Sequence, residues 1–134
     1  MDTVSVTRDV LERLLEEARR DTARECCGLL AGRDGVITTV LPATNALASP
    51  TAYEIAPDEL FRLFRHMREV RLDHLGIYHS HPKGENAPSP RDIELAYYPE
   101  AAYFIVSPQT DAARAIRAFR IREGVVDELG IATK

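Results

Sequence analysis

The sequence is short of the features that would tie it to an oxidising compartment or to a membrane. Its only cysteines, Cys26 and Cys27, are neighbours and cannot join distant parts of the fold, which is typical of proteins from a reducing compartment. No stretch approaches the ~18 uninterrupted apolar residues that a membrane span needs. The N-terminal segment has neither the apolar core nor the cleavage site of a signal peptide. We therefore expect a cytoplasmic protein without a membrane partner.

An excess of basic residues is also missing. The chain has 17 Lys and Arg against 21 Asp and Glu, which gives a formal net charge of -4, and its basic residues are scattered along the sequence. Binding to nucleic acid usually needs a basic face that displaces counterions from phosphates. This balance argues against a general nucleic-acid binder.

Length and composition indicate one ordinary globular domain over residues 1–134. The chain is 45% hydrophobic and 28% charged, as expected for a folded domain rather than a disordered or fibrous protein. A domain of this length buries roughly two-thirds of the surface that its unfolded chain exposes, so it needs neither disulfides nor a structural metal. Any bound metal would therefore be free to serve chemistry.

Hydrophobic periodicity predicts three helices. Residues 10–18 place their apolar side chains on one helical face. A Pro-Asp-Glu start at 57–59 opens a second helix, whose apolar stripe extends to Val70. Ser89, as an N-cap before a proline, predicts a short third helix that runs to Tyr97.

Buried or alternating apolar runs predict the strands. These runs are residues 26–32, 36–41, 53–55, 75–78 and 102–106. The stretch from Ala112 to Arg122 fits either a helix or a strand. The Glu123-Gly124 pair that follows is typical of a hairpin turn, which favours a strand on each side of it.

Two histidines stand two residues apart where the strand at 75–78 ends. Because side chains repeat every second residue along a strand, His79 and His81 leave the same face and can share one ion. Asp92 follows across a loop, close enough in sequence to return as a third ligand. Two histidines and a carboxylate suit zinc, and three protein ligands leave a fourth position open for water, as in catalytic sites.

Each of these residues also has an ordinary structural explanation. Two histidines on one strand can form a satisfied buried pair, while Ser89 and Asp92 can serve only the start of a helix. Glu25 can be an exposed acid at the edge of a strand. His66 and His74 lie outside the group, and we expect them on the surface or in packing.

Taken together, the residues form a far more specific pattern than any of them alone. Glu25, then His79-x-His81, seven residues, Ser89, two residues and Asp92 resembles the signature of the JAMM, or MPN-plus, metalloproteases at every position.

The resemblance extends beyond the motif. The segments ECCGLLAG at 25–32 and GIYHSHP at 76–82 are also similar to the family, and the order of elements suits it over nearly the whole chain. The chain looks like the compact, stand-alone bacterial and archaeal members. The resemblance implies an α+β, cytidine-deaminase-like fold, in which a curved and mostly antiparallel sheet is flanked by helices.

The resemblance also implies the roles of the motif residues. Zinc would be held by His79, His81 and Asp92, with Glu25 just outside the ligands. Glu25 would take a proton from the attacking water and later pass one to the leaving amine, and Ser89 would help to hold the developing oxyanion. An amide nitrogen leaves poorly unless it is protonated, so one carboxylate can serve both steps.

Stand-alone relatives in this family imply hydrolysis of an amide bond after the C-terminal Gly-Gly tail of a ubiquitin-like or sulfur-carrier protein. The sequence leaves open whether the leaving group is a following residue, a lysine side chain or a single amino acid. It also leaves open whether the protein forms a homodimer.

Two other functions have to be weighed against this one. The first is a non-catalytic MPN-type interaction scaffold, a role of relatives that lack the metal ligands, whereas this chain keeps them all. The second is a zinc nucleoside deaminase, which needs His-x-Glu followed by Pro-Cys-x-x-Cys. Neither deaminase motif is present.

Overall fold

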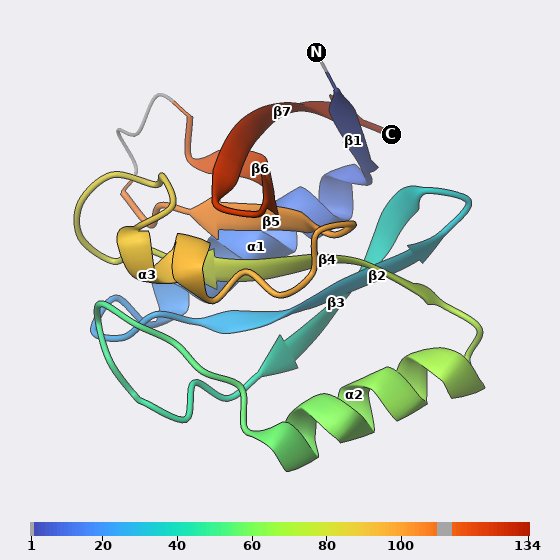
Figure 1. The fold of residues 1–134 in the computed structure, drawn as a ribbon, viewed down its shortest axis with the longest axis horizontal. Helices are drawn as coiled ribbons and strands as arrows, with labels where there is room; N and C mark the ends of the chain where they lie inside the picture. The colour runs from blue at the N-terminus through green and yellow to red at the C-terminus, as the bar shows by residue number, and fades with distance from the viewer. Residues whose placement is uncertain (1, 110–113) are drawn as a thin grey trace.

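The computed structural model describes residues 2–109 and 114–134 and is drawn in Figure 1. Its elements are, in chain order, β1 (Thr3–Val6), α1 (Arg8–Arg20), β2 (Cys27–Arg33), β3 (Val36–Ala43), α2 (Pro57–Glu69), β4 (Asp73–Ser80), α3 (Pro90–Glu94), β5 (Ala102–Val106), β6 (Ile116–Arg122) and β7 (Val125–Thr133). Within the described residues the strands follow one another in the order β1-β3-β2-β4-β5-β6-β7.

The sheet is curved so strongly that it closes into a barrel, because β1 pairs in parallel with both β3 and β7. In the part of the chain that the structure describes, β4 and β5 are also parallel, and the other four pairings are antiparallel. The predicted α+β fold with a curved, mostly antiparallel sheet is therefore confirmed. Its closure through a four-residue strand at the N-terminus was not predicted.

Side chains that alternate along the central strands fill two separate cores. Leu30 of β2 and Tyr78 of β4 belong to the core that includes the buried side of α1, with its residue Leu14. Their neighbours Leu29 and Ile77 point to the opposite face and belong to the second core, together with the buried Met67 of α2. This period of two follows from strand geometry, and it buries β4 on both faces. The strand that carries His79 is therefore held firmly.

The helices follow the predicted pattern with one correction. The first and second are confirmed as Arg8–Arg20 and Pro57–Glu69. The third ends at Glu94, so its predicted extension to Tyr97 is wrong. The backbone leaves the helix because the Tyr98 amide donates to the hydroxyl of Tyr103 at 3.0 Å. Across the described residues, no helix has the length and apolar character needed to cross a membrane.

The predicted short strand at residues 53–55 is wrong. This segment is not paired with the sheet, because its backbone groups bond within their own loop. The carbonyl of Glu54 accepts from the amide of Ala46 at 2.8 Å, and the amide of Glu54 donates to the side chain of Asn45 at 3.2 Å. The segment therefore belongs to the loop between β3 and α2.

The hairpin predicted near the C-terminus is confirmed. Strands β6 and β7 pair on either side of Glu123 and Gly124, whose φ angles of 50° and 79° match the turn that suits a two-residue hairpin. Ile116–Arg122 is a strand, so that part of the ambiguous segment is resolved in favour of a strand. Residues 112 and 113, where the ambiguity began, lie outside the described residues.

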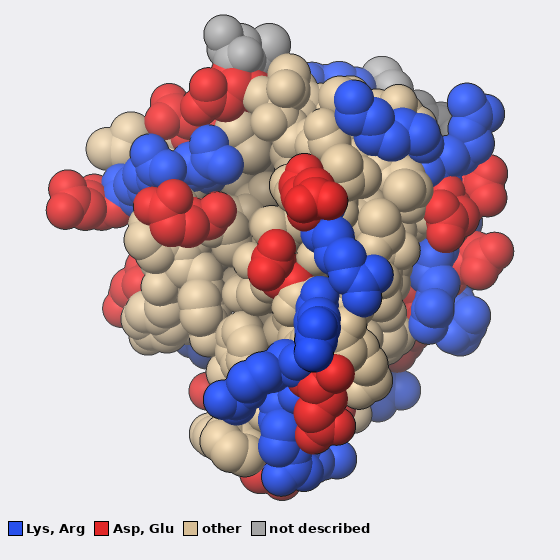
Figure 2. All heavy atoms as spheres, turned by 90° about the vertical axis from the view of Figure 1, so that its right-hand side faces the viewer, with Lys and Arg blue, Asp and Glu red and all other residues tan. Residues whose placement is uncertain are grey.

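One face of the molecule is shown as spheres in Figure 2. Basic and acidic side chains lie next to one another across this face instead of forming a field of one sign.

Arg33 has a structural role, because its guanidinium donates to the backbone carbonyls of Val70 and Arg71, just after α2, at 2.7 and 3.1 Å. The carbonyl groups at the C-terminal end of a helix carry partial negative charge, which favours a cation there.

Candidate metal centre

Three side chains from two elements converge at the C-terminal end of β4. His79 lies in β4 and His81 immediately after it, while Asp92 lies in the first turn of α3. The two Nε2 atoms are 3.1 Å apart. The Oδ2 atom of Asp92 lies 3.2 Å from Nε2 of His79 and 3.1 Å from Nε2 of His81. Three potential ligand atoms thus form a nearly equilateral triangle.

The size of this triangle fits a metal ion. In a tetrahedral zinc site with bonds of about 2.0–2.1 Å, neighbouring ligand atoms lie roughly 3.3 Å apart. The three observed separations of 3.1–3.2 Å are close to that spacing. Two imidazole nitrogens and one carboxylate oxygen are also a donor set that zinc accepts. The arrangement can therefore bind one ion and keep one coordination position free of protein.

The second ring nitrogen of His81 supports this interpretation. Nδ1 of His81 lies 2.8 Å from the carbonyl oxygen of Glu85, and a carbonyl can only accept, so Nδ1 carries a hydrogen. In the neutral ring Nε2 then has a lone pair directed at the carboxylate of Asp92. Two acceptors 3.1 Å apart repel unless a proton or a metal ion lies between them. A ring with its hydrogen on Nδ1 and its lone pair on Nε2 is also a tautomer that metal-binding histidines use.

The two histidines respond differently to burial. Burial lowers the pKa of His79, and the nearby carboxylate of Asp92 does not offset this effect, so His79 favours its neutral form. Burial also acts to lower the pKa of His81, but hydrogen bonds to Asp92 and to the Glu85 carbonyl outweigh it and raise the pKa overall. The Nδ1 atom of His79 is buried without a hydrogen-bond partner among the described residues.

Asp92 is held in place by the start of α3. Its backbone amide donates to the Ser89 hydroxyl at 3.1 Å, and the Ser89 amide donates to Oδ2 of Asp92 at 2.9 Å, which is a complete capping box. Burial acts to raise the pKa of Asp92, but hydrogen bonds from His79 and His81 hold it well below its usual range. The carboxylate is therefore charged and oriented.

Glu25 lies two residues before β2 and close to the two histidines. Its carboxylate and the two imidazoles offer ligand atoms that all lie within 4.8 Å of one another. The side chain is buried, and Oε1 has no hydrogen-bond partner among the described residues. Desolvation is the main reason why the pKa of Glu25 is raised to about 7. A carboxyl in this state can exchange a proton near neutral pH.

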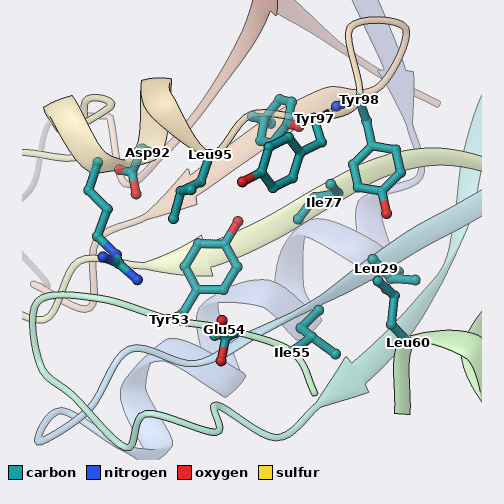
Figure 3. Close-up of a pocket in the computed structure, with 12 residues that line it drawn as sticks. Leu29, Tyr53, Glu54, Ile55, Leu60, Ile77, Asp92, Leu95, Tyr97 and Tyr98 are labelled. Atoms are coloured by element: carbon teal, nitrogen blue, oxygen red, sulfur yellow. Dashed lines mark hydrogen bonds between the residues drawn. The ribbon is translucent and has the colours of Figure 1, made fainter. Parts of the chain in front are cut away.

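A cavity of about 220 Å³ is lined at one point by Asp92, one of the three converging groups. In Figure 3 the carboxylate of Asp92 lies at one end of the cavity and Leu60 and Tyr98 lie at the other. The ring of Tyr53 forms part of the wall and stacks on the imidazole of His79, with centroids 4.6 Å apart and planes 24° from parallel. The wall is mostly aromatic and aliphatic, so the cavity suits an extended peptide segment better than a highly charged ligand.

The structure brings together all five residues that the sequence singled out. Asp92 and Glu25 both lie close to His79 and His81, and Ser89 contacts Asp92. The two other histidines do not take part. The ring of His74 packs edge-on against Phe64 and Tyr98, and His66 is exposed on α2.

The sequence did not predict the contact between Ser80 and Cys26, which supports the site. Ser80, between the two histidines, points to the other side of the strand, where its hydroxyl accepts from the amide of Cys26 at 2.9 Å and its amide donates to the Cys26 carbonyl at 3.0 Å. This pair ties the residue after Glu25 to the strand of the histidines. The alternation of His-Ser-His could have predicted the direction of Ser80 but not its partner.

Comparison with known proteins places these features in a wider group. The family model described as prokaryotic homologs of the JAB domain matches residues 7–122. A CysO-cysteine peptidase from Mycobacterium tuberculosis is 36% identical over 125 residues, which cover 92% of this chain and 86% of that protein. A probable TtuB-protein conjugate cleaving protease from Thermus thermophilus is 40% identical over 120 residues, covering 89% and 76%.

The fold is also similar to solved structures. The solution structure of protein DSY2949 from Desulfitobacterium hafniense has a TM-score of 0.87 and 33% sequence identity, and the match covers 98% of this chain and 93% of that one.

Proposed function

Because the chain belongs to the family of prokaryotic homologs of the JAB domain, we propose that it is a zinc-dependent JAMM-type hydrolase of protein conjugates. It cleaves an amide bond after the C-terminal tail of a ubiquitin-like or sulfur-carrier protein. The observation that carries this proposal is the triangle of His79, His81 and Asp92 with the buried carboxyl of Glu25 beside it.

In this proposal His79, His81 and Asp92 hold the zinc ion. Their ligand atoms are spaced for one ion, and a neutral His79 and a charged Asp92 are in the protonation states that a metal needs. The pKa of His81 is raised by its contacts, so metal binding there replaces a proton. When bound, zinc supplies Lewis-acid chemistry, because it polarises a carbonyl and lowers the pKa of water toward ~7. The remaining steps depend on the residues around it.

Glu25 moves the proton. Its carboxyl group has a pKa raised to about 7 by burial, so it can accept a proton from water and release it again at the working pH. The Oε1 atom has no competing partner among the described residues. The same group then protonates the amide nitrogen, which otherwise leaves poorly. Glu25 is therefore the general base and general acid of the proposed reaction.

The hydroxyl hydrogen of Ser89 is available to bind the substrate. Its Oγ atom accepts the amide hydrogen of Asp92, and no acceptor for the hydroxyl hydrogen is found among the described residues. A hydroxyl can accept and donate at once, so Ser89 can donate to the carbonyl oxygen as negative charge develops on it. In the proposed reaction this is its role.

The substrate class follows from two lines of support. Two relatives are named CysO-cysteine peptidase and probable TtuB-protein conjugate cleaving protease. The adjoining cavity has the size and the apolar wall to hold a short extended tail. We propose a tail that ends in Gly-Gly, because residues without side chains allow the backbone to approach the recessed ligands closely.

A cleavage assay tests the proposal. Purified zinc-loaded protein is mixed with a small carrier protein extended beyond its terminal Gly-Gly by a peptide, by a lysine isopeptide or by one amino acid, and the products are identified by mass spectrometry. We expect cleavage after Gly-Gly that stops on chelation and returns with zinc, with Glu25→Gln as the inactive control. Undiminished cleavage by metal-free protein, or equal cleavage by Glu25→Gln, contradicts the mechanism.

A further inference from the structure

The half-buried side chain of Asn45 binds several backbone groups of the loop between β3 and α2. Its Nδ2 atom donates to the carbonyl of Ala52 at 3.0 Å and approaches that of Ser49 at 3.5 Å. Its Oδ1 atom accepts from the amides of Leu47 at 3.0 Å and Glu54 at 3.2 Å. One amide group therefore satisfies backbone groups from both ends of the loop.

The same side chain reaches out of its loop to Glu25. Nδ2 of Asn45 donates to the backbone carbonyl of Glu25 at 3.0 Å. The amide of Glu25 donates to the carbonyl of Ser49 at 2.8 Å, and Ser49 belongs to the loop that Asn45 closes. Both peptide groups that flank the Cα atom of Glu25 are thus bound to this loop. The direction of its Cα–Cβ bond is fixed by these contacts.

This backbone anchor matters because the carboxylate has little to hold it. Glu25 is buried, yet its Oε1 atom has no hydrogen-bond partner among the described residues. A carboxylate that is free to receive a proton cannot also be held by strong side-chain partners. Its aim toward His79 and His81 must therefore come from the backbone from which it extends.

We propose that Asn45 is a positioning residue that aims the Glu25 carboxylate at the reacting groups, an inference that rests on the proposed function. Asn45 touches neither the ligands nor the cavity, and it acts through the peptide groups of Glu25.

Two substitutions test this role. Asn45→Ala removes the whole amide, whereas Asn45→Asp keeps the acceptor for Leu47 and Glu54 but loses the donor to Glu25. We expect both to lower kcat by about 10–100-fold, a loss typical of an outer partner of a site, with zinc content unchanged. Ser49→Ala is the matched control: it removes side-chain hydrogen bonds of the same loop but keeps the carbonyl that binds Glu25, so its kcat should stay within about twofold of wild type.

A double-mutant cycle separates positioning from general loosening. If Asn45 acts through Glu25, adding Asn45→Ala to Glu25→Gln should change the residual rate by less than about twofold, because residues that act as one unit are not additive. A full further loss in the Glu25→Gln background overturns the proposal. So does a loss with Asn45→Ala no greater than with Ser49→Ala.

A crystallographic comparison needs no activity. In Asn45→Ala, or in Asn45→Asp if the first variant does not fold, the Glu25 side chain should adopt new or multiple conformers while His79, His81 and Asp92 stay in place. An unmoved Glu25 carboxylate contradicts the proposal. If wild-type protein cleaves no carrier conjugate, the proposed function fails, while this comparison still decides whether Asn45 positions Glu25.

Discussion

The Nδ1 nitrogen of His81 donates to the backbone carbonyl of Glu85 at 2.8 Å. This one contact sets the tautomer of the ring, because the opposite nitrogen is left with its lone pair facing His79 and Asp92. A backbone carbonyl as the outer partner cannot be removed by a side-chain substitution. The backbone of the loop after β4 therefore fixes the His81 tautomer that can bind a cation.

The first prediction concerns Ser89, which has a structural and a chemical role. Ser89→Ala removes the acceptor for the Asp92 amide, so we expect a loss of about 1 kcal/mol in the free energy of unfolding, as for other N-cap substitutions. It also removes a donor to the developing oxyanion, which should lower kcat by roughly 100-fold or more. Denaturant unfolding and steady-state kinetics measure the two effects.

Ser89→Thr is the matched control for this prediction, because it keeps a hydroxyl that can cap the helix and donate to the substrate. It should restore most of the stability and most of the rate. If Ser89→Ala loses stability but keeps the wild-type kcat, the hydroxyl serves only the helix.

The second prediction is a pH dependence of stability in the metal-free protein. Burial raises the pKa of Glu25 from 4.5 to about 7 in the folded state, so between these values the folded chain holds a proton that the unfolded chain has released. Stability must then fall as pH rises from about 4.5 to 7. From about 1.4 kcal/mol per pKa unit, the fall due to Glu25 should be of the order of 2–3 kcal/mol.

Glu25→Gln isolates this contribution, because a neutral amide cannot titrate while the other groups of the site remain. The free energy of unfolding is measured for both proteins in the presence of a chelator at about pH 5 and pH 8. The wild type should lose more stability than the variant over that interval. Parallel pH curves for the two proteins would show that the Glu25 carboxyl titrates normally.

The third prediction concerns the ring that covers His79. Tyr53 stacks on the imidazole at 4.6 Å, and Nδ1 of His79 has no hydrogen-bond partner among the described residues to orient it. Tyr53→Leu should therefore loosen His79 and weaken zinc binding by about tenfold, as measured by competition with a chelator. Tyr53→Phe keeps the stacked ring and should bind zinc as wild type does. Equal affinity for all three proteins would show that stacking does not orient the ligand.

Much of the fold could be predicted because the sequence pattern and the burial agree. The apolar runs of β2 and β4 and the apolar stripe of α2 are buried in the two cores. The barrel closure could not be predicted, because Thr3–Val6 is short and its pairing with β7 joins opposite ends of the chain. No local pattern encodes a contact of that sequence separation.

In the site, too, the features set by neighbouring residues could be predicted, whereas a contact between distant residues could not. Spacing along one strand predicted that His79 and His81 share a face, and the cap at Ser89 predicted the placement of Asp92. The support for Glu25 could not be predicted, because Asn45 lies 20 residues away in a loop whose residues 53–55 read as a strand. The fold of that loop depends on a side chain rather than on periodicity.

The most direct test of the central claim is anomalous diffraction at the zinc edge from crystals of the zinc-loaded protein. We expect one ion, with bonds of about 2.0–2.2 Å to Nε2 of His79, Nε2 of His81 and a carboxylate oxygen of Asp92, and with Glu25 outside the ligand set. An ion bound by Glu25 and the two histidines without Asp92, or a peak elsewhere in the molecule, would contradict the account.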